Sequence, residues 1–445
     1  MQTIVLPQET DVLKGSFLPP GDKSISHRAV MFGALSEGTS FYSHFLEAED
    51  CLHTVRAFQS LGVSMESENA GELRIKGAGM NGLKAPEKEL YLGNSGTTMR
   101  LMLGILAGQR FQAVLSGDPS LSSRPMGRVT RPLKQMGAQI KGRDHGNFAP
   151  LTIRGGRLRG IDFENDLASA QVKSAILLAG LFAEGPTRIK EWIPSRDHTE
   201  RFLEGAGASF RREGEWISVE RTERLQALEA EIPGDISAAA FFIAGAAMTP
   251  GSELTVEKVC LNPTRTGFLE VLKKMGASIQ SAVTQEVPEP FGTIHIRGGR
   301  LRGTRITKKE IPSLIDELPI LMTAAALAEG ESLISGAEEL RVKETDRIHS
   351  MVTGLKTLGA NIEELPDGCL IRGVERFRGG RVRSFGDHRT AMSLAIATLM
   401  MKDELTIEDI ACVATSFPSF FDEFRRLKQK IKKRISSNEG KSRNM

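Results

Sequence analysis

The sequence predicts an α/β protein of two similar domains, each made of three βαβαββ units, with six repeats in total. The first observation is a segment of small and apolar residues, ending in a turn, that recurs six times. Successive segments start 70, 76, 65, 80 and 72 residues apart. They begin at Met31, Leu101, Leu177, Phe242, Met322 and Leu394.

The second observation is the order of elements after each segment. Each segment is typical of the C-terminal half of a buried helix that Gly or a polar turn stops. A short strand, a polar loop and an amphipathic helix come next. Five of these second helices run into a Gly-containing break and two further strands, as in SLGVSM before LRIKG and KMGASI before IHIRG.

The sixth unit lacks the closing pair of strands, because its last segment, Phe420–Ile431, has a helical pattern with no strands after it. Two strand-like pieces at the other end of the chain, Thr3–Leu6 and Val12–Leu18, have no unit of their own. We therefore expect residues 1–19 to supply the missing hairpin.

This assignment predicts the domain division. Residues 20–232 form one domain, and residues 1–19 plus 233–430 form the other. The chain would then cross between domains twice, near Pro20 and Pro233, which predicts a hinge and domain closure. Residues 431–445 have a basic, polar composition that predicts a disordered tail.

Composition excludes several classes of protein. The 51 basic and 54 acidic residues before Lys428 give a net charge of −3, so the body of the chain does not favour nucleic acid. The longest apolar runs are too short to cross a membrane. Four widely spaced cysteines and no signal-peptide pattern favour a reducing cytoplasm. We expect a cytoplasmic monomer.

The starts of the first helices carry unusual polar residues. N-cap chemistry alone accounts for Asp22, Asn94 and Asp235. It does not account for the polar side chains just inside the helices. Helix N-termini that converge on one cleft would bind anions. These side chains are Lys23, Ser24, Arg28, Ser169, Gln171, His388 and Arg389.

The loops before the second helices add charge at one recurring position, in SLSSRPMGR, IPSRDHTER and ELRVKETDR. Runs of charge are usually solvated, but the repetition favours function. The chain has no Walker-type phosphate loop, no dinucleotide fingerprint and no metal-binding spacing of His and Cys. We therefore expect chemistry on small phosphorylated anions without a metal or a cofactor.

At these residues the sequence closely resembles the 5-enolpyruvylshikimate-3-phosphate synthase family. The resemblance extends to about residue 430, through PGDKSISHR, LGNSGTTMR, LSSRPM, SAQVKSA, SRDHTE, IDELPIL, KETDRI and GDHRTAMS. It implies the enolpyruvyl transferase fold, and transfer of the enolpyruvyl group of phosphoenolpyruvate to the 5-hydroxyl of shikimate 3-phosphate.

The resemblance also implies roles for individual residues. Lys23 would lie between the two substrates, Asp316 would take the proton of the 5-hydroxyl, and Glu344 would protonate the methylene carbon. The cations beside Glu344 should lower its pKa, so bound anions would have to offset them. The other implied substrate contacts are Ser24, Arg28, Asn94, Gly96, Thr97, Arg124, Ser169, Ala170, Gln171, Arg196, Lys343, Arg347, His388 and Arg389.

Two departures and two alternatives remain. Thr415-Ser416 stand where many family members have lysine, and Leu101 stands where the better-known branch has proline. The first alternative is UDP-N-acetylglucosamine enolpyruvyl transferase, but that family's reactive cysteine before the Arg-Pro pair is absent at Arg124-Pro125. The second, a non-catalytic polyanion-binding protein, would need neither Asp316 nor Glu344.

Overall fold

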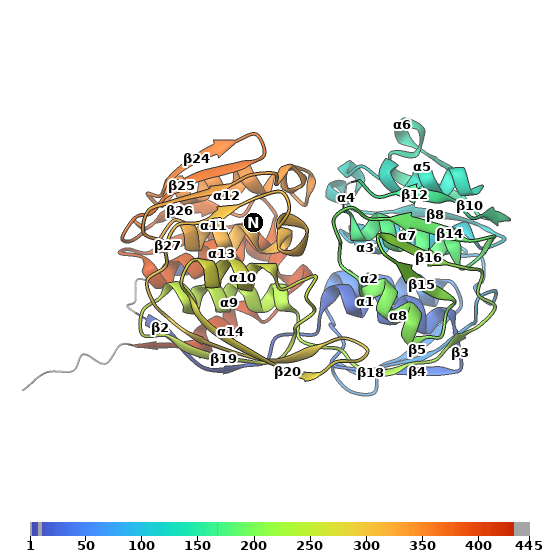
Figure 1. Cartoon of the computed structure of the whole chain (residues 1–445), viewed down its shortest axis with the longest axis horizontal. Helices are drawn as coiled ribbons and strands as arrows, with labels where there is room; N and C mark the ends of the chain where they lie inside the picture. Colours follow the sequence, from blue (N-terminus) through green and yellow to red (C-terminus); the bar gives the residue numbers. More distant parts are fainter. Residues whose placement is uncertain (1, 8–10, 167, 431–445) are drawn as a thin grey trace, which may run out of the picture.

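The computed structural model describes residues 2–7, 11–166 and 168–430 and consists of two lobes that lie side by side (Figure 1). Among the described residues, each lobe contains three sheets of three or more strands, one for each predicted unit. The predicted tail, 431–445, lies outside the described residues. The mixed α/β architecture agrees with the fold class that the sequence predicts.

The sheets of the first lobe share one strand order. A leading strand pairs in parallel with the strand after the first helix, and two antiparallel strands follow. The units comprise α1 (Lys23–Leu35), β4 (Thr39–Ser43), α2 (Glu49–Ser60), β5 (Ser64–Glu66), β6 (Leu73–Lys76) and the leading strand β18 (Glu229–Glu231); β7 (Leu90–Tyr91), α3 (Gly96–Ala107), β8 (Gln112–Ser116), α4 (Pro119–Ser123), α5 (Gly127–Met136), β9 (Gln139–Gly142), α6 (Arg143–Gly146) and β10 (Phe148–Arg154); and β12 (Asp162–Glu164), α7 (Ala170–Gly180), β14 (Thr187–Lys190), α8 (His198–Gly205), β15 (Phe210–Glu213) and β16 (Trp216–Val219).

In the second lobe the middle unit repeats this order, the first unit gains β28 (Lys428–Lys430) as an extra strand, and the last unit has β1 (Thr3–Leu6) in place of the two antiparallel strands. Two small parallel pairs, β3 (Ser36–Glu37) with β17 (Leu225–Gln226) and β11 (Leu158–Arg159) with β13 (Ala183–Glu184), complete the first lobe. The units of the second lobe comprise β2 (Asp11–Phe17), α9 (Ile236–Met248), β19 (Glu253–Cys260), α10 (Gly267–Lys274), β20 (Ser278–Gln285) and β21 (Phe291–Arg297); β22 (Arg305–Ile306), η1 (Ile311–Ser313), η2 (Ile315–Glu317), α11 (Leu318–Ala325), β23 (Glu331–Ile334), η3 (Glu338–Val342), α12 (Arg347–Thr357), β24 (Asn361–Leu365) and β25 (Gly368–Arg372); and β26 (Gly380–Arg383), α13 (His388–Ala397), η4 (Thr398–Met400), β27 (Leu405–Glu408), β1 (Thr3–Leu6), η5 (Ile410–Thr415), α14 (Phe420–Leu427) and β28 (Lys428–Lys430).

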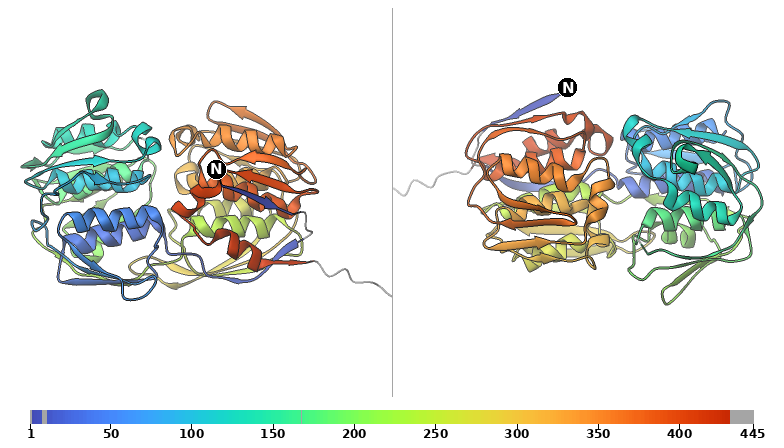
Figure 2. Two further views of the ribbon diagram at one scale, coloured as in Figure 1. Left: turned by 180° about the vertical axis from the view of Figure 1, so that it is seen from behind. Right: turned by 90° about the horizontal axis from the view of Figure 1, so that it is seen from above.

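The N-terminal strands do not form the predicted hairpin. β1 pairs antiparallel with β27, whereas β2 pairs in parallel with β19 and antiparallel with β28, so the two strands lie in different sheets. Figure 2 shows the first strand lying along the second lobe. The hairpin prediction is wrong because β2 serves as the leading strand of the fourth unit. β18 serves the first unit in the same way.

The first helices of the units form the core of each lobe. All 13 residues of α9 are buried, because its sequence is small and apolar on every side. Close packing also needs glycine. A Cβ at Gly104 on α3 would lie 2.2 Å from the carbonyl oxygen of Ala175 on α7. These helices are therefore fixed in the interior, and only their N-termini are free to contribute to a surface.

The two chain crossings pair with each other. The amide of Asp22 donates to the carbonyl of Pro233 at 2.8 Å, and the amide of Asp235 donates to the carbonyl of Pro20 at 2.7 Å. Gly21 and Gly234 form an antiparallel bridge between these residues. The repeated Pro-Gly-Asp sequence therefore meets itself between the lobes and directs α1 and α9 into opposite lobes.

The first prediction concerns β2. Phe17 is 1% exposed and packs on Phe242 with ring centroids 4.8 Å apart, whereas its neighbour Leu18 is 49% exposed. Phe17→Ala should lower the free energy of unfolding by about 3–5 kcal/mol. Leu18→Ala should change it by no more than about 0.5 kcal/mol. Urea denaturation measures both, and equal effects would contradict the packing of β2 in the second lobe.

Candidate active site

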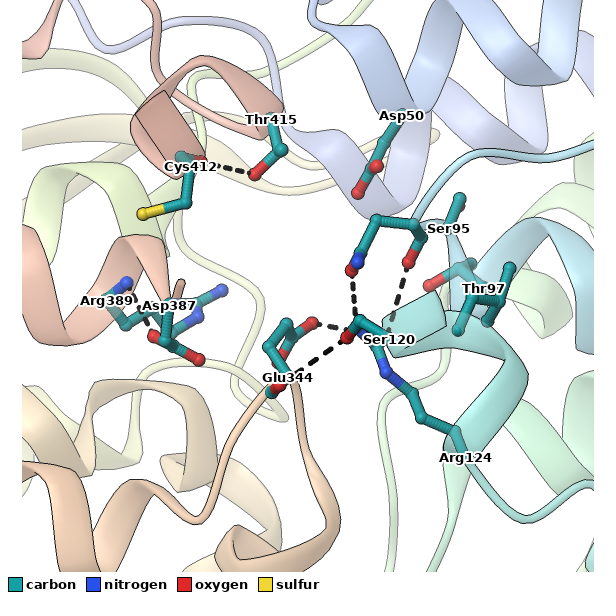
Figure 3. A network of polar contacts seen from close by, with 12 residues as sticks. Asp50, Ser95, Thr97, Ser120, Arg124, Glu344, Asp387, Arg389, Cys412 and Thr415 are labelled. Atoms are coloured by element: carbon teal, nitrogen blue, oxygen red, sulfur yellow. Dashed lines mark hydrogen bonds and ion pairs between the residues drawn. The ribbon is translucent and has the colours of Figure 1, made fainter. Parts of the chain in front are cut away.

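A cleft of about 390 Å³ lies between the lobes and is lined by helix N-termini and by the loops before the second helices. Figure 3 shows part of it, with Glu344 beside Ser120 and Arg124, and Arg389 on another wall. Except for Arg28, all the residues predicted at the site line this cleft: Lys23, Ser24, Asn94, Gly96, Thr97, Arg124, Ser169, Ala170, Gln171, Arg196, Asp316, Lys343, Glu344, Arg347, His388 and Arg389.

Side-chain caps fix the helix starts that reach the cleft. Asp22 accepts from the amide of Ile25 at 3.0 Å and caps α1, and Ser169 caps α7. Asn94 does not cap α3, because Ser95 does so. Its amide instead donates to Asp118 at 2.7 Å, and its side-chain oxygen accepts from a guanidinium group. Capping is therefore the structural role of Asp22 and not of Asn94.

Three guanidinium groups hold the carboxylate of Asp316. Arg196 Nη2 lies 2.6 Å from Oδ2, and Arg347 Nη1 and Arg389 Nε lie 3.2 Å and 3.8 Å from Oδ1. Burial opposes ionisation, but the charges of Arg389, Arg196, Lys343 and Arg347 hold the pKa of Asp316 well below its usual value. Asp316 is therefore ionised at neutral pH. Since Arg196 comes from the first lobe, this contact also joins the two walls.

Glu344 has a similar environment and shares Arg347 with Asp316. Its Oε2 accepts from Arg347 Nη2 at 2.5 Å, and its Oε1 lies 3.5 Å from Arg124 Nη1 of the first lobe. Burial again opposes ionisation, but Arg347, Arg124, His388 and Lys23 hold the pKa of Glu344 well below its usual value. Glu344 is thus ionised in the protein on its own.

Two lysines reach the cleft with different partners. Lys23 Nζ lies 3.1 Å from Asp50 Oδ2, and although burial acts in the opposite direction, the carboxylates of Asp50 and Glu344 raise the pKa of Lys23. Burial lowers the pKa of Lys343, against the attraction of Asp316. Lys23 is consequently a fixed cation, whereas a bound anion would stabilise the charged form of Lys343.

Arg28 does not line the cleft. It is 3% exposed, and it donates to Thr199 Oγ1 at 2.8 Å, to the Ser24 carbonyl at 2.9 Å and to Ser174 Oγ at 2.9 Å. In this structure Arg28 therefore holds the first turn of α1 against α7 and α8. Arg28 is the sixth residue of α1, and its long side chain turns back along the helix to Ser24.

Thr415 and Ser416 stand where many family members have a lysine, and neither residue lines the cleft. Thr415 Oγ1 donates to the carbonyl of Cys412 at 2.7 Å, within the same 3-10 turn. Figure 3 shows Cys412 and Thr415 joined by this hydrogen bond. Thr415 therefore does not replace the lysine as a cation.

Some cleft residues were not among those expected at the site. Arg100 on α3 donates to Gln171 Oε1 at 2.6 Å, and it ends the GNSGTTMR motif. Arg128 forms an ion pair of 2.6 Å with Glu339 across the cleft. Asp50 lies in the first turn of α2, where an acidic residue is ordinary and gives no functional signal. Arg265 also lines the cleft, although no motif contains it.

Within the part of the chain that the structure describes, no group of three or more His, Cys, Asp or Glu side chains is placed to hold a metal ion. No described helix is long and apolar enough to cross a membrane. The charged groups that line the cleft are therefore cations together with carboxylates that form no such metal-binding group, and Asp316 and Glu344 are among these carboxylates.

Two lobes of three related units, joined by two crossings and facing each other across this cleft, define the enolpyruvyl transferase fold. The family model described as EPSP synthase (3-phosphoshikimate 1-carboxyvinyltransferase) matches residues 7–424. The chain belongs to this family.

Sequence and structural similarity to members of this family extends over nearly the whole length of the chain. The chain is 50% identical over 423 residues to a 3-phosphoshikimate 1-carboxyvinyltransferase of Alkaliphilus metalliredigens, covering 95% of this chain and 99% of that protein. It is 52% identical over 417 residues to one of Methylococcus capsulatus, covering 93% and 95%. The solved EPSP synthase of Acinetobacter baumannii superposes with a TM-score of 0.86 at 46% identity, covering 97% of this chain and 99% of that structure.

The second prediction concerns the charge of the cleft. Inorganic phosphate should stabilise the protein more than sodium chloride of equal ionic strength, because its charges pair with Lys343 and Arg389. At a hundredfold excess over Kd the gain is about 2.7 kcal/mol. Lys343→Gln should reduce the phosphate-dependent rise in Tm. Arg297→Gln, at an exposed arginine on β21, should leave it unchanged. Calorimetry measures these shifts, and equal losses in both variants would exclude specific binding.

Proposed function

We propose that this chain catalyses transfer of the enolpyruvyl group of phosphoenolpyruvate to the 5-hydroxyl of shikimate 3-phosphate and releases phosphate. The observation that carries the proposal is the pair of ionised carboxylates, Asp316 and Glu344, each held by arginines from both lobes. A site that only bound anions would need neither a base nor an acid among its cations. Membership of the EPSP synthase family supports the same reaction.

The acceptor would occupy the part of the cleft nearest α1 and α7. Ser169 and Ala170 begin α7, so the helix N-terminus favours the 3-phosphate there. Lys343 and Arg196 lie at the same cleft and add charge. Ser24 and, through its contact with Ser24, Arg28 would fix the carboxylate and hydroxyl end, while Gln171 would lie beside the ring.

Phosphoenolpyruvate would lie between Lys23 and the arginines on the other side. Arg124, Arg347 and Arg389 offer planar forks that match carboxylate and phosphate oxygens. Asn94, Gly96 and Thr97 at the start of α3 complete this wall, and His388 begins α13. Burial and the neighbouring cations lower the pKa of His388 well below its usual value, so its ring is neutral.

Proton transfers then depend on the two carboxylates. The 5-hydroxyl oxygen attacks C2 of phosphoenolpyruvate while Asp316 accepts its proton, and C3 gains a proton from Glu344. The tetrahedral adduct loses phosphate, and a proton leaves C3 to restore the double bond. A base must be ionised to accept a proton, and Asp316 is already ionised before the substrates bind. Glu344 suits its role once the substrates' negative charges offset the field of Arg347 and Arg124.

We further propose that the enzyme is a cytoplasmic monomer with domains of residues 20–232 and of 1–19 plus 233–430. One chain supplies both walls of the cleft, so catalysis needs no second copy. The free, separate thiols of Cys51, Cys260 and Cys369, all buried, suit a reducing compartment.

The third prediction is acceptor choice, which tests the reaction. Phosphate release from phosphoenolpyruvate should require shikimate 3-phosphate and proceed without added metal. UDP-N-acetylglucosamine should not support it. Turnover with the UDP-sugar alone would overturn the proposal in favour of the related transferase.

The fourth prediction separates chemistry from binding. Asp316→Asn and Glu344→Gln should each lower kcat by about 10²–10⁴-fold, because each removes one proton transfer in the transition state. The Kd for shikimate 3-phosphate should change far less. Steady-state kinetics with calorimetric titration measures both quantities. Near-normal kcat with a raised KM would remove that residue from the acid–base role.

The fifth prediction concerns the proton on Glu344. Its pKa is well below the usual value in the protein on its own, and two bound anions raise it. Protons should therefore be taken up on binding wherever the pH lies between the lowered and the raised pKa. Calorimetric titration of phosphoenolpyruvate into Asp316→Asn saturated with shikimate 3-phosphate, in buffers of different ionisation enthalpy, measures this uptake.

Adding Glu344→Gln to that variant is the control, and it should abolish the uptake. Uptake that persists in the double variant would assign the proton to another group. No uptake in either protein would show that Glu344 reaches the complex without a proton.

A further inference from the structure

A buried carboxylate lies behind the wall of the cleft in the first lobe. Glu191, in the loop between β14 and α8, is 5% exposed and does not line the cleft. It accepts four hydrogen bonds: from Lys173 Nζ at 2.8 Å, Asn165 Nδ2 at 3.0 Å, Ser195 Oγ at 2.5 Å and Ser195 N at 3.4 Å. All three donor residues are buried as well.

One of these donors controls the loop that begins α7. Asn165 Nδ2 also donates to the carbonyl of Ser169 at 3.2 Å, and Asn165 Oδ1 accepts from the Ser169 amide at 3.4 Å. Ser169 is the N-cap of α7 and lines the cleft. Glu191 therefore sets the orientation of the amide that holds the Ser169 backbone on both sides.

Another donor controls the loop that carries Arg196. Ser195 gives both its hydroxyl and its amide to Glu191, and its carbonyl accepts from Lys173 Nζ at 3.3 Å. The described backbone between β14 and α8 has no helix or strand, and a further fixed point is Asp197, which accepts from Asn262 Nδ2 at 2.6 Å. Ser195 immediately precedes Arg196, whose guanidinium group extends to Asp316. The same carboxylate thus fixes two separate loops at one wall.

The charge of this carboxylate is balanced locally. Lys173 is fully buried and also contacts Glu200 Oε1 at 2.7 Å. A buried carboxylate with a paired cation contributes little net field to the cleft, so Glu191 does not cancel the positive charge that the anion needs. Removing its charge would leave Lys173 with Glu200 as its remaining carboxylate partner.

We propose that Glu191 is a positioning residue for the phosphorylated acceptor: it holds Ser169 and Arg196 in the relative geometry that binds the acceptor's phosphate, without touching the acceptor. The inference rests on the proposed function and on the acceptor contacts of Ser169 and Arg196. Loss of the Glu191 carboxylate should not alter the binding of phosphoenolpyruvate, because Arg124, Arg347 and Arg389 belong to other elements.

The test is Glu191→Gln with Glu200→Gln as the matched control, since both remove a buried carboxylate from Lys173. Glu200 has no hydrogen bond to either loop, although it also pairs with the half-exposed Arg212. Glu191→Gln should raise KM for shikimate 3-phosphate about tenfold, as loss of a charge-assisted bond implies. Its kcat, and its KM for phosphoenolpyruvate at saturating acceptor, should stay within about twofold. Glu200→Gln should leave all three within that range.

Ser195→Ala gives a second measurement that does not disturb the buried charges. It should raise the same KM by a smaller factor, and adding it to Glu191→Gln should give less than the product of the two effects. If Glu191→Gln fails to fold, Ser195→Ala decides the question together with Asn165→Ala, because Ser195 lines the cleft whereas Asn165 does not. An unchanged acceptor KM, or equal losses in kcat and both KM values, would overturn the proposal. A wild-type enzyme that does not use shikimate 3-phosphate would instead overturn the proposed function.

Discussion

The buried guanidinium group of Arg265 is the interaction on which the rest of this structure depends. It lies 3.0 Å from Asp22 and 3.4 Å from Asp235, the N-caps of α1 and α9 at the paired chain crossings. It also donates to Ser237, whose hydroxyl contacts Glu317 beside Asp316. Two carboxylates this close would repel each other in a dry interior without the arginine. The first helices of the two lobes, α1 and α9, can therefore begin next to each other. Arg265 also fixes the start of α1 relative to η2 through its contacts with Asp22 and Ser237.

The charge in the cleft depends on that junction. Helix starts and charged loops from both lobes crowd cations together, and like charges at this density would push the walls apart. The protein offsets the repulsion with its own carboxylates. Three carboxylates of the second lobe form ion pairs with arginines of the first lobe: Asp316 with Arg196, Glu344 with Arg124, and Glu339 with Arg128. The groups proposed to move protons also hold the arginines, so a substrate anion must compete with a carboxylate for each guanidinium group it binds.

Local patterns predicted most of this architecture, and long-range pairing limited the rest. The six repeats were visible because buried helices that end in glycine leave a periodic composition. The polar residues at the starts of those helices predicted the cleft, since similar units place their helix N-termini on the same side of each lobe. Pairing of β1 and β2 was wrong because strand sequences do not record their partners. Asp50 and Arg265 were missed because an acidic residue at a helix start, or a lone arginine, has no pattern of its own.

The two lobes share a fold but hold their cleft loops by different means. In the first lobe the loops before α7 and α8 are fixed from behind by Glu191, a carboxylate that never reaches the cleft. In the second lobe the corresponding loops are fixed from inside it, because Arg347 binds Asp316 and Glu344 directly and is anchored by Asp387 at 2.8 Å. A ligand can displace the second set of contacts but not the first. Rigidity therefore belongs to the wall proposed for the acceptor, and rearrangement belongs to the wall that carries the acid and the base.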